Sequence, residues 1–204
     1  MTEPVRRRTY ARELCLQYLY MYEFQPESAP DELDSFIEHH TKGNRDRKGR
    51  VVIAEFAERL CKGVVENNKA IDNWIVGIAK NWPIDRMAHV DRNVLRLAIF
   101  ELVFGNNDAP PKVVINEAIE LAKRFSTAQS SSFVNGILDR VRMLVADARS
   151  IGVDHPAPPE RIEVGGSGES SRSKIKSSFD DGPFSVVPDI TENIDAIFKV
   201  WGAM

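Results

Sequence analysis

The sequence predicts an all-α protein of about seven helices, followed by a mostly disordered C-terminal tail. Through most of the first 151 residues, apolar side chains recur at intervals of three and four, the spacing that places them on one side of a helix. The same stretch has no alternating apolar and polar run of useful length, so strands are not expected. With 43% hydrophobic and 28% charged residues, the chain has the composition of a globular protein that buries a core.

Three amphipathic helices are expected in the first part of the chain, the first of them over residues 4–22. Gln25–Pro30 separates it from a short second helix. Lys42–Arg50 holds five basic residues against one acidic residue, and we expect a solvated loop there, with a secondary contact to phosphates as the alternative. The three apolar stripes are, in order, Ala11, Leu14, Cys15, Tyr18, Leu19 and Tyr22; Leu33, Phe36, Ile37 and His40; and Ile53, Phe56, Ala57, Leu60 and Val64.

Four more helices are expected before residue 152. The fourth ends at Pro83, which lacks a backbone donor, and Asp85 can cap the fifth, which stops near Gly105. Pro110-Pro111 precede the sixth helix, and Ser130–Ser132 supply an N-cap for the seventh. Their stripes are Ile71, Trp74, Ile75, Ile78, Ala79 and Trp82; Val90, Val94, Leu97 and Ala98; Val114, Ala118, Leu121, Ala122 and Phe125; and Val134, Ile137, Leu138, Val141 and Val145.

The composition changes after residue 151, which divides the chain into a helical domain, 1–151, and a tail, 152–204. The tail has nine acidic and five basic residues, and its Gly165–Ser178 segment is too rich in Gly, Ser and charge to bury a core. Apolar residues return at helical spacing near the end, so a short amphipathic helix is expected over residues 189–202. The tail carries a net charge of −4 and the body +1, so overall charge gives no evidence for nucleic-acid binding.

The sequence shows no pattern typical of an enzyme, a metal site or a cofactor site. The four histidines lie in different segments apart from the adjacent His39 and His40, which point in different directions on a helix. Cys15 and Cys61 lie on or beside apolar stripes and are expected to be buried, reduced thiols of a cytoplasmic protein. Nucleotide-binding glycine motifs and the nucleophile motif of hydrolases are absent from the sequence. We therefore expect no catalytic residue, no metal and no cofactor.

Four arginines at the start of the chain are the strongest functional signal. Arg6, Arg7, Arg8 and Arg12 lie where a helix begins, although the helix dipole favours acidic residues there. A solvated helix start is the simpler interpretation. The alternative is an anion-binding edge, because guanidinium groups match phosphate geometry and single-stranded RNA is bound by basic edges with aromatic faces nearby.

Three blocks of the sequence resemble the NusB family of transcription antitermination factors. They are RRRTYARELCLQYLY at residues 6–20, VDRNVLRLAIFEL at 90–102, and the stretch 110–142 with KVVINEAIELAK and FVNGILD. The blocks occur in the family's order. The resemblance implies two packed three-helix sub-bundles. It also implies a protein that binds the boxA element of nascent rRNA together with ribosomal protein NusE, joins the RNA polymerase antitermination complex, and supports rRNA transcription and maturation.

The resemblance also implies roles for individual residues. The RNA-binding residues that it implies are Arg6, Arg7, Arg8, Arg12, Tyr20, Gln129 and Phe133, and Asp91 would contact the NusE partner. Thr9 and Tyr10 lengthen the spacing before Arg12, so Arg6–Arg8 are expected either on the first helix or in an arm before it.

Several features stay open at the level of sequence. The main alternative function is a protein-only interaction scaffold with weak or lost RNA binding, which would use the acidic tail for docking. A monomer and a homodimer are equally compatible with the sequence. No membrane contact is expected, because the apolar run Leu97–Gly105 is interrupted by Glu101 and is too short to cross a bilayer.

Overall fold

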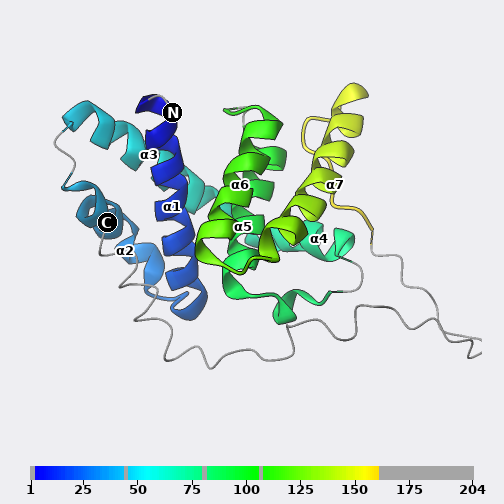
Figure 1. The fold of residues 1–204 in the computed structure, drawn as a ribbon, viewed down its shortest axis with the longest axis horizontal. Helices are drawn as coiled ribbons and strands as arrows, with labels where there is room; N and C mark the ends of the chain where they lie inside the picture. Colours follow the sequence, from blue (N-terminus) through cyan, green and yellow to red (C-terminus); the bar gives the residue numbers. More distant parts are fainter. Residues whose placement is uncertain (1–2, 44–45, 80–81, 106–107, 161–204) are drawn as a thin grey trace, which may run out of the picture. The chain divides into compact units, whose positions relative to one another are not determined.

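The computed structural model describes residues 3–43, 46–79, 82–105 and 108–160, and the regular secondary structure of this part of the chain is entirely helical (Figure 1). It contains seven α-helices and, within the described residues, no strand, which confirms the all-α prediction. The helices are α1 (Glu3–Phe24), α2 (Ala29–Thr41), α3 (Arg47–Glu66), α4 (Asn68–Ile78), α5 (His89–Ile99), α6 (Pro111–Phe125) and α7 (Ser130–Ser150). A 3₁₀ turn, η1 (Ile84–Arg86), precedes α5, and a π-helical segment, η2 (Phe100–Phe104), continues it.

Helices α1, α2 and α3 form the first bundle (Figure 1). Tyr18 of α1 lies at its centre, where its ring centroid is 5.9 Å from that of Phe36 on α2. The Tyr18 hydroxyl donates a hydrogen bond of 3.2 Å to the carbonyl of Ala29. A buried hydroxyl without a partner would be costly, so this bond fixes the first turn of α2 against α1.

Helices α5, α6 and α7 form the second bundle, and α4 packs against α5 and α7. Val94, Leu121 and Leu138 contribute one buried side chain from each of the three helices. Helix α1 also packs against α5 and thereby joins the two bundles (Figure 1). The expected pair of three-helix sub-bundles is confirmed, with α4 packed mainly against the second of them.

Two predicted boundaries in the first half were wrong. Helix α3 begins at Arg47, because the carboxylate of Asp46 accepts a hydrogen bond of 3.1 Å from the Lys48 amide and caps the helix. The second half of the expected Lys42–Arg50 loop is therefore the first turn of a helix. Helix α4 ends at Ile78, so Trp82 lies beyond it although it continues the apolar spacing.

The expected caps of two later helices were also wrong. Asp85 lies in η1 and does not cap α5, which begins at His89 after Ala88. Ser130–Ser132 form the first turn of α7, and Gln129 occupies the N-cap position without a side-chain hydrogen bond to the helix. The serine hydroxyl of Ser130 instead bonds to groups in the preceding loop and in α5.

Residues 152–160, which the sequence assigns to the tail, contact the helical body. Gly152 has φ +84°, a left-handed conformation that ends α7 and turns the chain back. The Nδ1 of His155 then hydrogen-bonds the carbonyl of Val103 at 3.2 Å, and a Cβ at Gly77 would lie 2.4 Å from the Pro159 carbonyl oxygen. The helix predicted over residues 189–202 lies outside the described residues.

Candidate nucleic-acid interface

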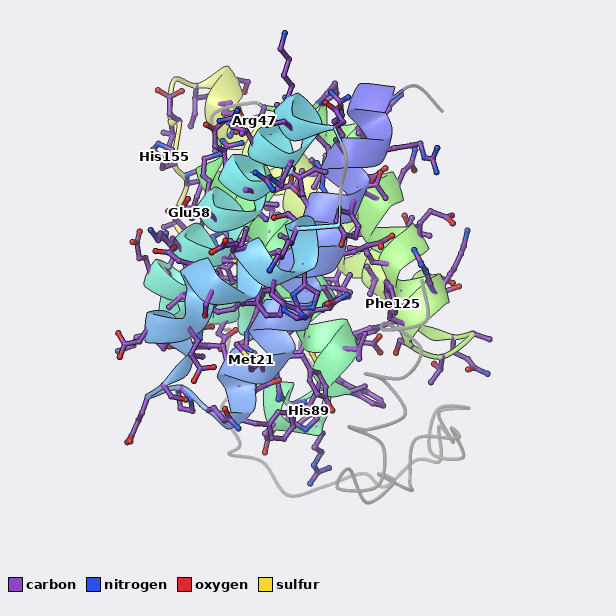
Figure 2. The ribbon with its side chains drawn as sticks, turned by 90° about the vertical axis from the view of Figure 1, so that its left-hand side faces the viewer. Met21, Arg47, Glu58, His89, Phe125 and His155 are labelled. Carbon is purple, nitrogen blue, oxygen red and sulfur yellow. The ribbon has the colours of Figure 1, made fainter. Side chains whose placement is uncertain are left out.

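Arg6, Arg7 and Arg8 lie on α1 rather than in an arm before it, because the helix already begins at Glu3. Arg6 and Arg8 are exposed, and Arg7 is half-buried. The Arg7 guanidinium pairs with the Asp46 carboxylate at 2.6 Å. This ion pair holds the start of α3 beside the start of α1, and Figure 2 shows Arg47 next to the first turns of α1. Basic residues from two helices therefore gather at one end of the first bundle.

Arg12 lies in the interior, with 2% of its surface exposed. Its guanidinium forms two hydrogen bonds to the Glu101 carboxylate, at 2.7 and 2.6 Å, and lies 3.7 Å from the Glu117 carboxylate. These contacts join α1 to η2 and α6. Arg12 therefore acts first as a buried link between the bundles, in contrast to the exposed Arg6 and Arg8.

Three guanidinium groups surround the ring of Phe56 on α3. Those of Arg8, Arg12 and Arg59 lie 5.4, 5.2 and 5.1 Å from the ring centroid, within the range of cation–π attraction. Arg59 was missed at the level of sequence because it is an isolated basic residue. Its spacing of three from Phe56, which puts both side chains on one helix face, was the available signal.

Gln129 and Phe133 lie together around the first turn of α7. Gln129 is exposed, and the half-buried Phe133 ring lies 6.3 Å from the ring of Trp82, which is 38% exposed. Paired aromatic side chains that reach the surface are suited to stacking with nucleic-acid bases. Trp82 was missed because its spacing assigned it to the apolar stripe of α4.

Asp91 is 4% exposed, so the residue expected to contact a partner lies inside the fold. Its Oδ2 accepts a hydrogen bond of 2.8 Å from the Ser130 hydroxyl, which also meets the hydroxyl groups of Ser126 and Thr127 at 2.9 Å. Burial raises the pKa of Asp91, and the hydrogen bonds from Ser126 and Ser130 partly oppose that shift. Asp91 thus fixes the loop that carries Gln129.

Tyr20 is also 4% exposed, at the opposite end of α1 from the arginines. Its ring lies 5.1 Å from Phe24 and 6.2 Å from His89. Figure 2 shows His89, at the start of α5, near Met21 of α1 and far from Arg47. Tyr20 therefore packs between α1 and α5. The neighbouring Phe24, whose ring it contacts, is exposed.

Glu23 binds the start of α5 to the end of α1. Its carboxylate accepts hydrogen bonds from Arg92, Arg96 and Asn93 and pairs with His89 at 3.0 Å. Burial alone would raise the pKa of Glu23, but the hydrogen bond with His89 and the charges of Arg92 and Arg96 outweigh it and lower the pKa. The tertiary position of α5 depends on this carboxylate.

Of the predicted RNA-binding residues, Arg6–Arg8 and Tyr20 lie toward opposite ends of α1, about 20 Å apart for the 13 residues from Arg7 to Tyr20. Between them, Arg124 of α6 forms an ion pair with Glu13 of α1, and its guanidinium lies 4.9 Å from the Phe125 ring centroid. The adjacent Lys123 is exposed. These basic residues at the end of α6 were also missed by sequence reasoning.

The described residues do not contain a cluster of three or more His, Cys, Asp or Glu side chains able to hold a metal ion. Cys15 and Cys61 are fully buried. Burial, together with a hydrogen bond to Cys61, raises the pKa of the Cys15 thiol well above its ordinary value and keeps it protonated. No helix of the described part is long and apolar enough to cross a membrane.

Comparisons with known proteins agree with this architecture. The NusB family model matches residues 9–143. Transcription antitermination protein NusB of Anaeromyxobacter dehalogenans is 45% identical over 143 residues, which cover 70% of this chain and 95% of that protein. The NusB of Trichlorobacter lovleyi is 46% identical over 140 residues, covering 69% of this chain and 93% of the relative.

Solved structures give the same result. T. maritima NusB superposes with a TM-score of 0.57 at 39% identity, over 67% of this chain and 90% of that one. A chain from a crystal structure of NusB and NusE in complex with double-stranded RNA superposes with the same TM-score at 28% identity, over 68% of this chain and 98% of that one. The sequence, the helical arrangement and these comparisons together establish that the chain belongs to the NusB family.

Proposed function

We propose that this chain is a non-enzymatic, RNA-binding transcription antitermination factor of the cytoplasm. It binds the boxA element of nascent rRNA together with ribosomal protein NusE and supports rRNA transcription and maturation. The observation that carries this proposal is the family match over residues 9–143. The complex of a related NusB with NusE and RNA supports the choice of partners.

The exposed residues fit the direct contacts to RNA. Arg6 and Arg8, with the half-buried Arg7, would bind phosphates at the start of α1. Gln129 and Phe133 would contact bases at the start of α7, where Trp82 adds a second ring. An RNA strand that contacts both the arginines of α1 and the start of α7 would run along the side of α1 on which Arg124 of α6 pairs with Glu13. Such a strand would connect the two bundles.

The buried residues fit a positioning role. Arg12 holds α1 to η2 through Glu101, Tyr20 packs α1 against the start of α5, and Asp91 fixes the loop before α7. We assign Asp91 to the NusE interaction through the shape of that loop rather than through direct contact. The three residues would then affect RNA or NusE binding by holding exposed neighbours in place.

The expected result of removing the first two arginines is a weaker dependence of RNA affinity on salt. Each phosphate contact to single-stranded RNA contributes about −0.7 to the slope of log affinity against log salt. Replacing Arg6 and Arg7 with Ala should therefore flatten the slope by about 1.4 while α1 remains helical. The measurement is filter binding of boxA RNA over a salt series, with circular dichroism to check the fold.

Lys62→Gln provides a matched control for this experiment. Lys62 is an exposed base that pairs with Glu58 on α3, and we expect its replacement to leave the slope unchanged. If the Arg6 and Arg7 variant kept the wild-type slope and affinity, the start of α1 would not be the RNA-binding edge. If the wild-type protein bound NusE but no RNA at all, the protein-only scaffold would be the better account.

A further inference from the structure

Asp108, just before α6, is held by two arginines from different helices. The Arg8 guanidinium of α1 donates a hydrogen bond of 2.7 Å to the Asp108 backbone carbonyl. Arg59 of α3 forms an ion pair with the Asp108 carboxylate. The acceptor oxygens of Asp108 thus occupy the position at which the two guanidinium groups converge.

The two arginines are oriented by the Phe56 ring. Their guanidinium groups lie 5.4 and 5.1 Å from its centroid, and the buried Phe56 leaves the ring little freedom to move. Arg12, whose charge is matched by Glu101, approaches the same ring at 5.2 Å. Arg8 and Arg59 therefore form a preorganised pair of donors at the surface.

The contact with Asp108 is easily exchanged. The side chains of Arg59 and Asp108 are 44% and 32% exposed, and ion pairs this accessible to water contribute little to stability. A phosphate offers the same kind of anionic oxygens as a carboxylate, and it matches the planar guanidinium fork at least as well. The side chains of Arg8, Arg59 and Asp108 together carry two positive charges and one negative charge, so this cluster has a net charge of +1.

We propose that Arg8 and Arg59 form a phosphate-binding fork for RNA, which Asp108 occupies in the free protein and leaves when RNA binds. The inference rests on the proposed RNA-binding function and adds to it a residue of α3, Arg59, and an internal competitor, Asp108. Arg8 follows Arg6 and Arg7 at the same end of α1, so one RNA strand would supply phosphates to all three. Asp108 then sets the RNA affinity of the free protein.

Substitutions on the two sides of the ion pair should have opposite effects. Asp108→Asn should raise the affinity for single-stranded boxA RNA up to about fivefold at low salt, because it removes an exposed ion pair that competes with RNA. Arg59→Gln should lower the affinity about tenfold, as expected for a lost charged hydrogen bond, and flatten the salt slope by about 0.7. Arg59→Lys keeps the positive charge but not the planar guanidinium group, so it should lower RNA affinity with little change in the salt slope.

The double variant tests the mechanism most sharply. If Asp108 acts by occupying the fork, Asp108→Asn should give no gain in a protein that already carries Arg59→Gln. The exposed Glu58–Lys62 pair on α3 supplies matched controls. Glu58→Gln and Lys62→Gln make the same charge changes outside the fork, and we expect RNA affinity within about twofold of wild type.

Each outcome decides between the alternatives. Unchanged affinity and slope in Arg59→Gln would overturn the fork, provided that thermal unfolding shows an intact fold. An equal gain from Asp108→Asn with and without Arg59 would also overturn it, because the effect would then be one of general charge. A wild-type protein that binds RNA through Arg6 and Arg7 but is indifferent to Arg59 would refute this inference alone. Absence of RNA binding by the wild type would refute the proposed function as well.

Discussion

Replacing Arg12 with Met should destabilise the folded protein by about 3–5 kcal/mol, the largest single effect that we expect. Arg12 is buried and the Glu101 side chain is only 7% exposed, and the substitution leaves this carboxylate without its arginine partner. Breaking a buried ion pair from one side costs about this much because the remaining charge is uncompensated. Urea unfolding at neutral pH measures the change in the free energy of unfolding.

Two further variants separate this effect from a general loss of charge. Arg7→Met removes an arginine whose pair with Asp46 is partly open to water, with side chains 26% and 48% exposed, so it should cost no more than about 1 kcal/mol. Arg12→Met combined with Glu101→Leu replaces both charges and should recover much of the stability, since apolar replacement of a buried pair is often neutral. If Arg12→Met cost no more than Arg7→Met, Arg12 would not be the buried link between the bundles.

The second largest effect is expected at Glu23. Glu23→Gln should lower the free energy of unfolding by about 3 kcal/mol at neutral pH. This value is near the lower end of the range expected when one partner of a buried ion pair is removed. The loss is limited because two contacts remain. Arg96 keeps its ion pair with Asp72, and Arg92 keeps its hydrogen bond to the Ile84 carbonyl. Urea unfolding of both proteins at several pH values measures this difference and its pH dependence.

The pH dependence follows from the direction of the Glu23 shift. Its pKa in the folded protein lies below the ordinary value of 4.5, so the charged carboxylate stabilises the fold above that pH. This contribution is lost as the pH falls through the folded pKa and the carboxylate is protonated. The stability difference between wild type and Glu23→Gln should therefore shrink on acidification below 4.5, and a constant difference across the series would contradict the assignment.

The helices could be predicted from sequence because their apolar stripes are local patterns. The boundaries were less accurate where tertiary contacts decide them. Trp82 continues the spacing of α4, but its ring packs against Phe133 of α7 instead. Asp85 has the right residue type for a cap, yet it lies in η1 ahead of α5. A pattern within one segment contains no information about the partner that another segment supplies.

The same limit applies to the site. Sequence identified the residue types at Arg12 and Asp91 but not their burial, because Glu101 lies 89 positions from Arg12 and Ser130 lies 39 from Asp91. Arg6 and Arg8 are exposed as an RNA-binding role requires. The contribution proposed for Arg59 depends on its ion pair with Asp108 and on the Phe56 ring that it shares with Arg8. These contacts become visible only when α1, α3 and the start of α6 are brought together.

Fluorescence anisotropy of boxA RNA, with and without NusE, tests whether this chain is an RNA-binding antitermination factor. We expect boxA RNA to bind more tightly than a scrambled RNA of equal length. We also expect that NusE strengthens boxA binding, and that boxA RNA strengthens NusE binding by the same factor, as linkage requires. Equal affinities for the two RNAs, unchanged by NusE, would contradict this function.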